Sequence, residues 1–101
     1  MKTNVIIMGH LGKNPEITKT KNNKTLCTFT VAEKIENQDK PFWHNVVVWD
    51  EEAENCNKYL VKGSKVFVQG RVNESEYIDK SGEKKKIFEI NAQNIGFPMS
   101  K

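Results

Sequence analysis

The stretch at residues 42–49 constrains the fold of this chain more than any other. It is rich in aromatic and β-branched residues and contains neither Gly nor Pro, which predicts a β-strand. Because side chains alternate across a strand, one face carries a row suited to a core: Phe42, His44, Val46 and Val48. The other face carries Trp43, Asn45, Val47 and Trp49. One buried face would account for the first row and leave the two tryptophans outside.

The two tryptophans admit two interpretations. Trp43 and Trp49 lie roughly 20 Å apart at the rise of a strand, so each could stack on a different base of one extended nucleic-acid strand. They fit equally well in a second apolar layer against a helix or a partner subunit, since tryptophan is common in cores and interfaces. The stretch alone leaves both interpretations open.

Size and charge limit the remaining possibilities. The chain has 101 residues, which predicts one domain over residues 1–101 with one core. Its net charge of +3 is mildly compatible with a polyanionic partner. No apolar run approaches the ~20 residues of a membrane span, and the first residues lack the features of a signal peptide. We therefore expect a soluble cytoplasmic protein without a membrane partner.

The residues that could carry chemistry are scattered. Cys27 and Cys56 each fall within an apolar pattern, so we expect buried, reduced thiols. A zinc site would have to recruit both cysteines, His10 and His44 from four separate elements, and we expect no metal or other cofactor. The acidic residues at 50–54 open a predicted helix, where they match its dipole. Without a catalytic constellation, we expect a protein that is not an enzyme.

The order of elements predicts the fold class. Strands are expected at residues 4–11, 25–32, 42–49, 65–78 and 87–93, a helix at 50–63, a hairpin loop at 16–24 and a polar loop at 34–40. Asp50 is expected to cap the helix and Gly63 to end it in a left-handed conformation. The inward-facing residues are expected to be Ala53, Cys56 and Leu60 in the helix and Phe88, Ile90 and Ala92 in the last strand. In the second strand Cys27, Phe29 and Val31 share one face, and in the fourth strand Val66, Val68, Gly70 and Val72 share one face. An all-β chain with one short helix between strands three and four is the plan of the five-stranded OB-fold barrel.

The chain resembles the bacterial-type single-stranded DNA-binding proteins along nearly its whole length. The matching segments, in order, are residues 4–16, Phe-Thr-Val-Ala from Phe29, Trp-His-Asn-Val-Val-Val-Trp from Trp43, residues 59–72, Asp-Lys-Ser-Gly from Asp79, and Glu-Ile from Glu89. Each segment is weak by itself, but the ordered set with matching gaps is highly specific.

The resemblance implies binding of single-stranded DNA without much sequence preference, during DNA replication, recombination and repair, by a homotetramer. It assigns base stacking to Trp43, Trp49 and Tyr77, a basic contact to Lys62 and a polar one to Asn45, and it places His44 near a subunit contact. Apart from the resemblance, we expect Arg71, Lys84 and Lys85 to contact phosphates. Arg71 shares a strand face with Tyr77. A nucleoid-associated, cytoplasmic location follows from such a role.

The chain also departs from the family. The loop at residues 34–40 lacks an aromatic residue, and Asn-Glu-Ser-Glu at residues 73–76 stands where the family is usually basic, which implies weaker and less salt-sensitive binding. The sequence ends without an acidic tail, so replication and repair protein partners are not implied. The alternative is an OB-fold adaptor similar to primosomal protein B, acting in replication restart and holding mainly proteins.

Overall fold

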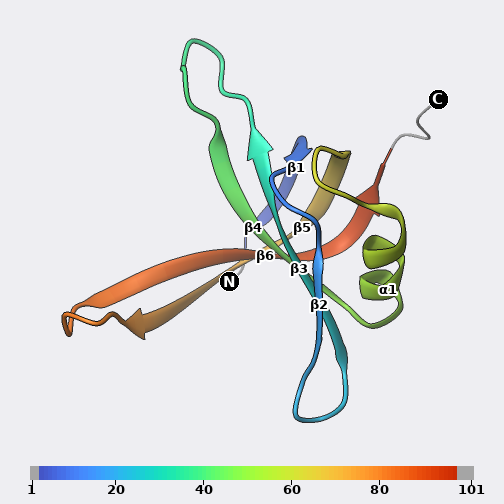
Figure 1. The fold of residues 1–101 in the computed structure, drawn as a ribbon. Coiled ribbons are helices and arrows are strands. Elements are labelled where there is room, and N and C mark those ends of the chain that lie inside the picture. Colours follow the sequence, from blue (N-terminus) through green and yellow to red (C-terminus); the bar gives the residue numbers. More distant parts are fainter. Residues whose placement is uncertain (1–2, 98–101) are drawn as a thin grey trace.

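Six strands and one helix make up the computed structural model, which describes residues 3–97 (Figure 1). In chain order they are β1 (Asn4–Leu11), β2 (Glu16–Lys19), β3 (Thr25–Glu33), β4 (Phe42–Trp49), α1 (Asp50–Tyr59), β5 (Lys65–Ile78) and β6 (Lys84–Gly96). The strand order is β1-β5-β6-β4-β3-β2, and a further pairing of β1 with β3 closes a ring. The all-β plan with one short helix before β5 is the predicted OB fold.

The ring closes where two backbones come very close. His10 and Leu11 of β1 pair with Ala32 and Val31 of β3. At Gly9, a Cβ atom would lie 2.2 Å from the carbonyl oxygen of Ala32, so no side chain fits there. The missing side chain at Gly9 therefore permits β1 to cross β3 at close range.

The core lies inside the ring and under α1. Its fully buried members come from β3, β4, β5 and the helix: Cys27, Val31, Val46, Val48, Ala53, Cys56, Val66 and Val68. Phe29, Leu60 and Ile90 join them, while Val72 and Ala92 are partly buried. Most of the predicted inward rows are therefore correct, because strand alternation and helix period both follow from local geometry.

Two predicted core residues are on the surface instead. Phe42 and Phe88 are 57% and 55% exposed. Each shares the inward side of its strand with core residues, but each lies where its strand extends past the ring. They line an apolar hollow of about 380 Å³ with Val5 and Ile7, and within residues 3–97 no other element covers them. Val47, predicted on the outward row, is buried.

The segment at residues 16–24 is not wholly a loop. Residues 16–19 form β2, which pairs antiparallel with residues 25–28 of β3, and only residues 20–24 make the turn. All four residues of β2 are exposed, so the sequence lacks the apolar alternation that identifies a strand. The barrel therefore has six strands by count, the sixth being this short edge strand.

The helix differs from its prediction at both ends. Trp49, the last residue of β4, is the N-cap, and no side chain caps the helix. Asp50 is instead the first helical residue, with a φ of 60°, because the chain enters the helix directly from the strand. The helix ends at Tyr59 with Leu60 extended, so residues 61–63 form a turn in which Gly63 has the predicted positive φ.

Some expectations concern residues outside the described range. The expected absence of a signal peptide concerns the start of the chain, and that of an acidic tail concerns its last residues. Both lie largely outside residues 3–97. In the part that is described, no helix has the length and apolar character needed to cross a bilayer.

Candidate nucleic-acid interface

The outward face of β3 and β4 forms a polar surface bounded by the two tryptophans. In the register of these strands, Ala32 opposes Trp43, Thr30 opposes Asn45, and Leu26 opposes Trp49. Residues directly opposite each other share a face, so Thr28, Thr30 and Asn45 lie between the two indoles. Trp43 is 52% exposed and Trp49 is 40% exposed, which leaves both rings available for stacking.

Each indole is held by a neighbouring element. An added Cβ at Gly12 would lie 2.4 Å from the Trp43 ring, so the ring packs against the backbone just beyond β1. The Nε1 atom of Trp49 donates a hydrogen bond to Asn91 Oδ1 at 3.1 Å, which fixes that ring against β6. Both rings are thus supported at an edge, and such support restricts their rotation.

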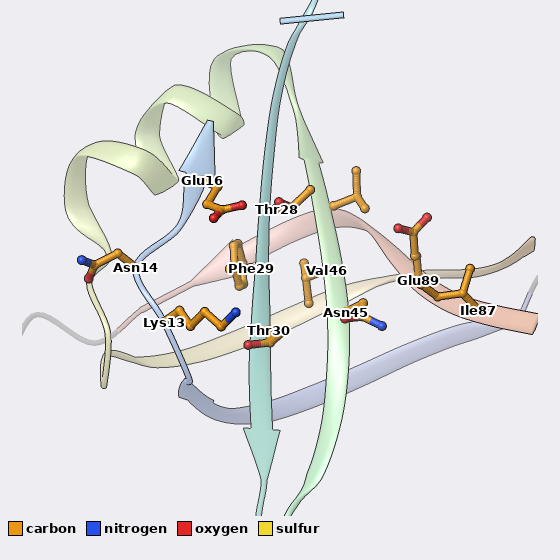
Figure 2. A pocket seen from close by; sticks show the side chains of 11 residues that line it. Lys13, Asn14, Glu16, Thr28, Phe29, Thr30, Asn45, Val46, Ile87 and Glu89 are labelled. Atoms are coloured by element: carbon orange, nitrogen blue, oxygen red, sulfur yellow. The ribbon is translucent and has the colours of Figure 1, made fainter. Parts of the chain in front are cut away.

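A groove runs across this face between the tryptophans. It encloses about 250 Å³, with β3 and β4 as its floor. Figure 2 shows Lys13, Asn14 and Glu16 on one wall and Ile87 and Glu89 of β6 on the other. Asn45 lines the groove, as its predicted role as a polar contact requires.

The hairpin of β5 and β6 extends the same face. Tyr77 opposes Lys85 and Arg71 opposes Asn91, and the latter is the acceptor for Trp49. Tyr77 is 52% exposed, so its ring is free, and Arg71 is exposed as well. These side chains therefore share the outward face with the groove.

The predicted lysines divide between two faces. Lys85 lies beside Tyr77 but already pairs with Glu83 at 3.4 Å and Asp79 at 4.0 Å. Lys84 opposes Ile78, on the other side of the hairpin. The structure thus separates two lysines that are adjacent in sequence, because neighbouring strand residues point in opposite directions.

Lys62 lies near the wall of the groove. Its backbone N–H donates to Asn14 Oδ1 at 2.7 Å, and Asn14 lines the groove. This bond joins the turn after α1 to the turn after β1, elements far apart in sequence. The position is consistent with a basic contact at the edge of the groove.

His44 and the acidic hairpin have partners within the chain. His44 Nε2 donates to Glu33 Oε1 at 2.8 Å, and the ring packs edge-on against Phe42, with ring centres 4.8 Å apart.

On the hairpin, Glu74 pairs with Lys86 at 3.4 Å. At the tip, hydrogen bonds from Ser81 and from the Glu83 backbone lower the pKa of the Asp79 carboxyl.

The thiols and histidines do not form a metal site. Among residues 3–97, no group of three or more potential ligands is close enough to bind an ion. Cys27 and Cys56 are buried and free. Burial raises the pKa of both thiols, that of Cys56 to about 12 with added repulsion from Cys27 and Glu52.

Of the eleven residues that line the groove, only Asn45 was predicted as a site residue; the charged and amide side chains that were missed are those of Lys13, Asn14, Glu16 and Glu89. Lys13 and Asn14 belong to the turn after β1, which sequence patterns describe only as a break, and Glu16 begins β2. Glu89 is a polar residue in the alternating pattern of β6, which is the ordinary pattern of a solvent-facing strand. No local feature marks these residues, since the groove is assembled from four separate segments.

Comparison with known proteins bears on this arrangement. The sequence profile of the Single-strand binding protein family matches residues 2–98. The chain belongs to this family. Among relatives, it is 35% identical over 94 residues to Single-stranded DNA-binding protein 1 of Chlorobaculum tepidum, covering 85% of this chain and 58% of the relative.

Two other relatives in the family show the same range of similarity. The Single-stranded DNA-binding protein of Neisseria meningitidis is 30% identical, covering 90% of this chain and 56% of its own length. Single-stranded DNA-binding protein 1 of Staphylococcus aureus is 31% identical, covering 96% of this chain and 65% of its own length. The chain therefore spans under two thirds of these relatives.

Proposed function

We propose that residues 1–101 form one OB-fold domain that binds single-stranded DNA without catalysing a reaction. The observation that carries the proposal is the pair of exposed indoles, Trp43 and Trp49, on one strand, β4, with the groove residues Asn45 and Val47 between them along that strand. Each ring stacks on a base, and stacking tolerates any sequence because every base has a π-face. Family membership supports this proposal, since the relatives named above are single-stranded DNA-binding proteins.

The remaining residues extend the path of the strand. Tyr77 provides a third stacking platform, and Asn45 makes a polar contact between the two tryptophans. Lys62, Lys84, Lys85 and Arg71 supply positive charge to the phosphates. Lys85 first has to exchange Glu83 and Asp79 for phosphate, and Lys84 reaches the strand only from the far side of the hairpin.

The function is tested by titrating the protein with oligo(dT) at two salt concentrations. Stacking on the indoles should quench tryptophan fluorescence, and the affinity should fall as salt rises because counterions are released from the DNA. Unchanged tryptophan emission at saturating oligonucleotide would contradict base stacking on the indoles. Tight capture of replication proteins together with weak DNA binding would favour the adaptor role similar to primosomal protein B.

We infer that the domain self-associates, as a tetramer. On the outward face of β1 and β5, Ile6 and Met8 are 65% and 53% exposed and Phe67 is 38% exposed. Ile6 opposes Gln69 and Met8 opposes Phe67, so they form one apolar patch away from the groove. Sedimentation should give a mass above 11.6 kDa, and Met8→Glu should reduce it. A wild-type monomer at micromolar concentration would contradict the inference.

A cytoplasmic, nucleoid-associated location follows from this function. Replication, recombination and repair expose single-stranded DNA, and the protein would bind that DNA at the nucleoid. A fluorescent fusion that failed to concentrate on the nucleoid after DNA damage would argue against this placement.

A further inference from the structure

Lys13 lies at the junction of two hollows on the outward face of β3 and β4. A hollow of about 240 Å³ opens beside the Trp43 ring and is lined by Gly12, Lys13, Thr30 and Trp43. The groove described above lies next to it, because Lys13 and Thr30 line both. Figure 2 shows the Lys13 side chain extending from its turn toward Thr30. The stacking surface at Trp43 and the groove are therefore neighbouring parts of one surface.

The turn that carries Lys13 is fixed on both sides. The backbone N–H of Gly12 donates to the carbonyl oxygen of Thr30 at 3.1 Å, which ties the turn to β3. Asn14 Oδ1 accepts a hydrogen bond from the Lys62 N–H at 2.7 Å, which ties the turn to the segment after α1. Because the backbone is already held beside the hollow, only the lysine side chain has to be ordered when a ligand binds.

The Lys13 ammonium has no carboxylate partner. Within residues 3–97, no acidic side chain lies within 4.0 Å of its Nζ atom. Lys85 and Lys86, by contrast, pair with acidic residues of the β5–β6 hairpin. A phosphate that binds Lys13 therefore displaces no existing ion pair, whereas a phosphate at Lys85 has to displace two.

The two residues shared by the hollows carry groups that bind phosphate. A lysine ammonium and a threonine hydroxyl both donate to phosphate oxygens, and such contacts position a nucleic acid without reading its sequence. Consecutive nucleotides of a single strand are joined by one phosphate, so bases in adjacent hollows place that phosphate between them. The donors at this junction are Lys13 Nζ and Thr30 Oγ1.

We propose that Lys13 and Thr30 bind the phosphate that joins the nucleotide stacked on Trp43 to the next nucleotide in the groove. The inference rests on the proposed function, because it assumes that single-stranded DNA stacks on Trp43. It adds a phosphate contact to those proposed above and places one nucleotide of the bound strand, with its base on Trp43 and its phosphate at Lys13.

The first test is the salt dependence of oligo(dT) binding by Lys13→Gln. Each phosphate contact on a single strand contributes about 0.7 to the slope of log K against log salt, so the slope should become less steep by about that amount. Lys58→Gln is the matched control, because it removes the same charge from α1, where the ammonium lies 5.2 Å from the centre of the Tyr59 ring. The control should keep the wild-type slope, and a wild-type slope in Lys13→Gln would overturn the phosphate contact.

Thr30→Val tests the second donor. The substitution removes the hydroxyl but no charge, so it should weaken binding and leave the salt slope unchanged. Unchanged affinity in Thr30→Val would overturn the role of the hydroxyl.

A double-mutant cycle with Trp43→Ala tests where the phosphate lies. If the base on Trp43 positions the phosphate, the loss of affinity caused by Lys13→Gln should be at least about twofold smaller when the ring is absent. Equal losses in the two backgrounds would overturn the placement beside Trp43.

Lysine acetylation followed by mass spectrometry tests the contact in the wild-type protein, without any variant. Lys13 should react in the free protein and be protected at saturating oligo(dT), whereas Lys58 should react equally in both states. Equal reaction of Lys13 in both states would overturn the contact while leaving DNA binding intact. Absence of oligo(dT) binding by the wild-type protein at low salt would instead overturn the proposed function.

Discussion

The indole nitrogen of Trp49 donates a hydrogen bond to the side-chain oxygen of Asn91 at 3.1 Å, joining the end of β4 to the middle of β6. The bond uses the edge of the indole and leaves its face open. In the register of the sheet, Asn91 also opposes Arg71, so a stacking ring and a basic residue meet at one asparagine. Asn91 is thus a positioning residue for Trp49.

Asn91→Ala should weaken DNA binding less than Trp49→Ala does. Loss of the hydrogen bond frees the ring, at a cost of about 0.5–1.5 kcal/mol in binding, whereas loss of the ring removes about 1–3 kcal/mol of stacking. Fluorescence anisotropy with labelled oligo(dT) measures both changes. Gln93→Ala is the matched control, because it removes a β6 hydrogen bond to Gln69 that does not involve a tryptophan.

The same pair can be examined by a double-mutant cycle. If Asn91 acts through the ring, Asn91→Ala should have no further effect in the Trp49→Ala background. Additive losses would show that Asn91 contacts DNA independently of Trp49.

Phe29→Ala and Phe88→Ala should differ sharply in stability. Phe29 is 5% exposed in the core, and its truncation should lower the free energy of unfolding by about 3–5 kcal/mol. Phe88 lies past the ring, where its truncation should change the free energy of unfolding by no more than about 0.5 kcal/mol. Urea unfolding followed by circular dichroism measures both. A large loss for Phe88→Ala would mean that another copy or another element covers it.

Gly9→Ala should destabilise the barrel where β1 crosses β3. The new methyl group would meet the Ala32 carbonyl oxygen, and relief requires the two backbones to separate, at a cost of about 1–3 kcal/mol or more. Gly96→Ala is the control, since its methyl group meets only the Phe67 side chain at 3.6 Å. Thermal melts should show a lower Tm for Gly9→Ala only. Equal Tm values for the two variants would contradict a tight contact between β1 and β3 at Gly9.

Both thiols should be unreactive in the folded protein. Burial raises the pKa of Cys27 above the ordinary 9.0 and that of Cys56 to about 12, so almost no thiolate exists at pH 8. Ellman's reagent should label both cysteines only after denaturation. Rapid labelling of the native protein would show that α1 opens readily.

The same shift sets a dependence of stability on pH. The unfolded chain loses its thiol protons near pH 9, while the folded chain keeps them to a higher pH. The free energy of unfolding should therefore fall as pH rises from 9 toward 12. Replacement of Cys56 by Ala should flatten this alkaline slope.

Much of the fold could be predicted because its determinants are local. The alternation predicts that Cys27, Phe29 and Val31 share one face of their strand, and all three are buried. The same reasoning failed for Phe88, which lies on the inward side of its strand but has no element packed over it. It also missed β2, whose exposed residues carry no apolar period.

The candidate site was predictable only in part. The strand pattern singled out Trp43 and Trp49 but left both stacking and packing open, and the family resemblance assigned stacking to them and to Tyr77. Lys13 and Glu89 were missed, since nothing in their own neighbourhoods distinguishes them from ordinary surface residues. Their proximity across one groove depends on the order of strands in the sheet.

The sequence by itself determined where the five long strands lie, which sides of those strands are apolar, and where the helix interrupts them. These properties depend on the geometry of a few neighbouring residues. Only the tertiary structure decided how far each apolar row is covered, that β2 has a partner, and that Glu89 faces the groove between two tryptophans. Such facts depend on contacts between segments far apart in the chain, which local periodicity does not encode.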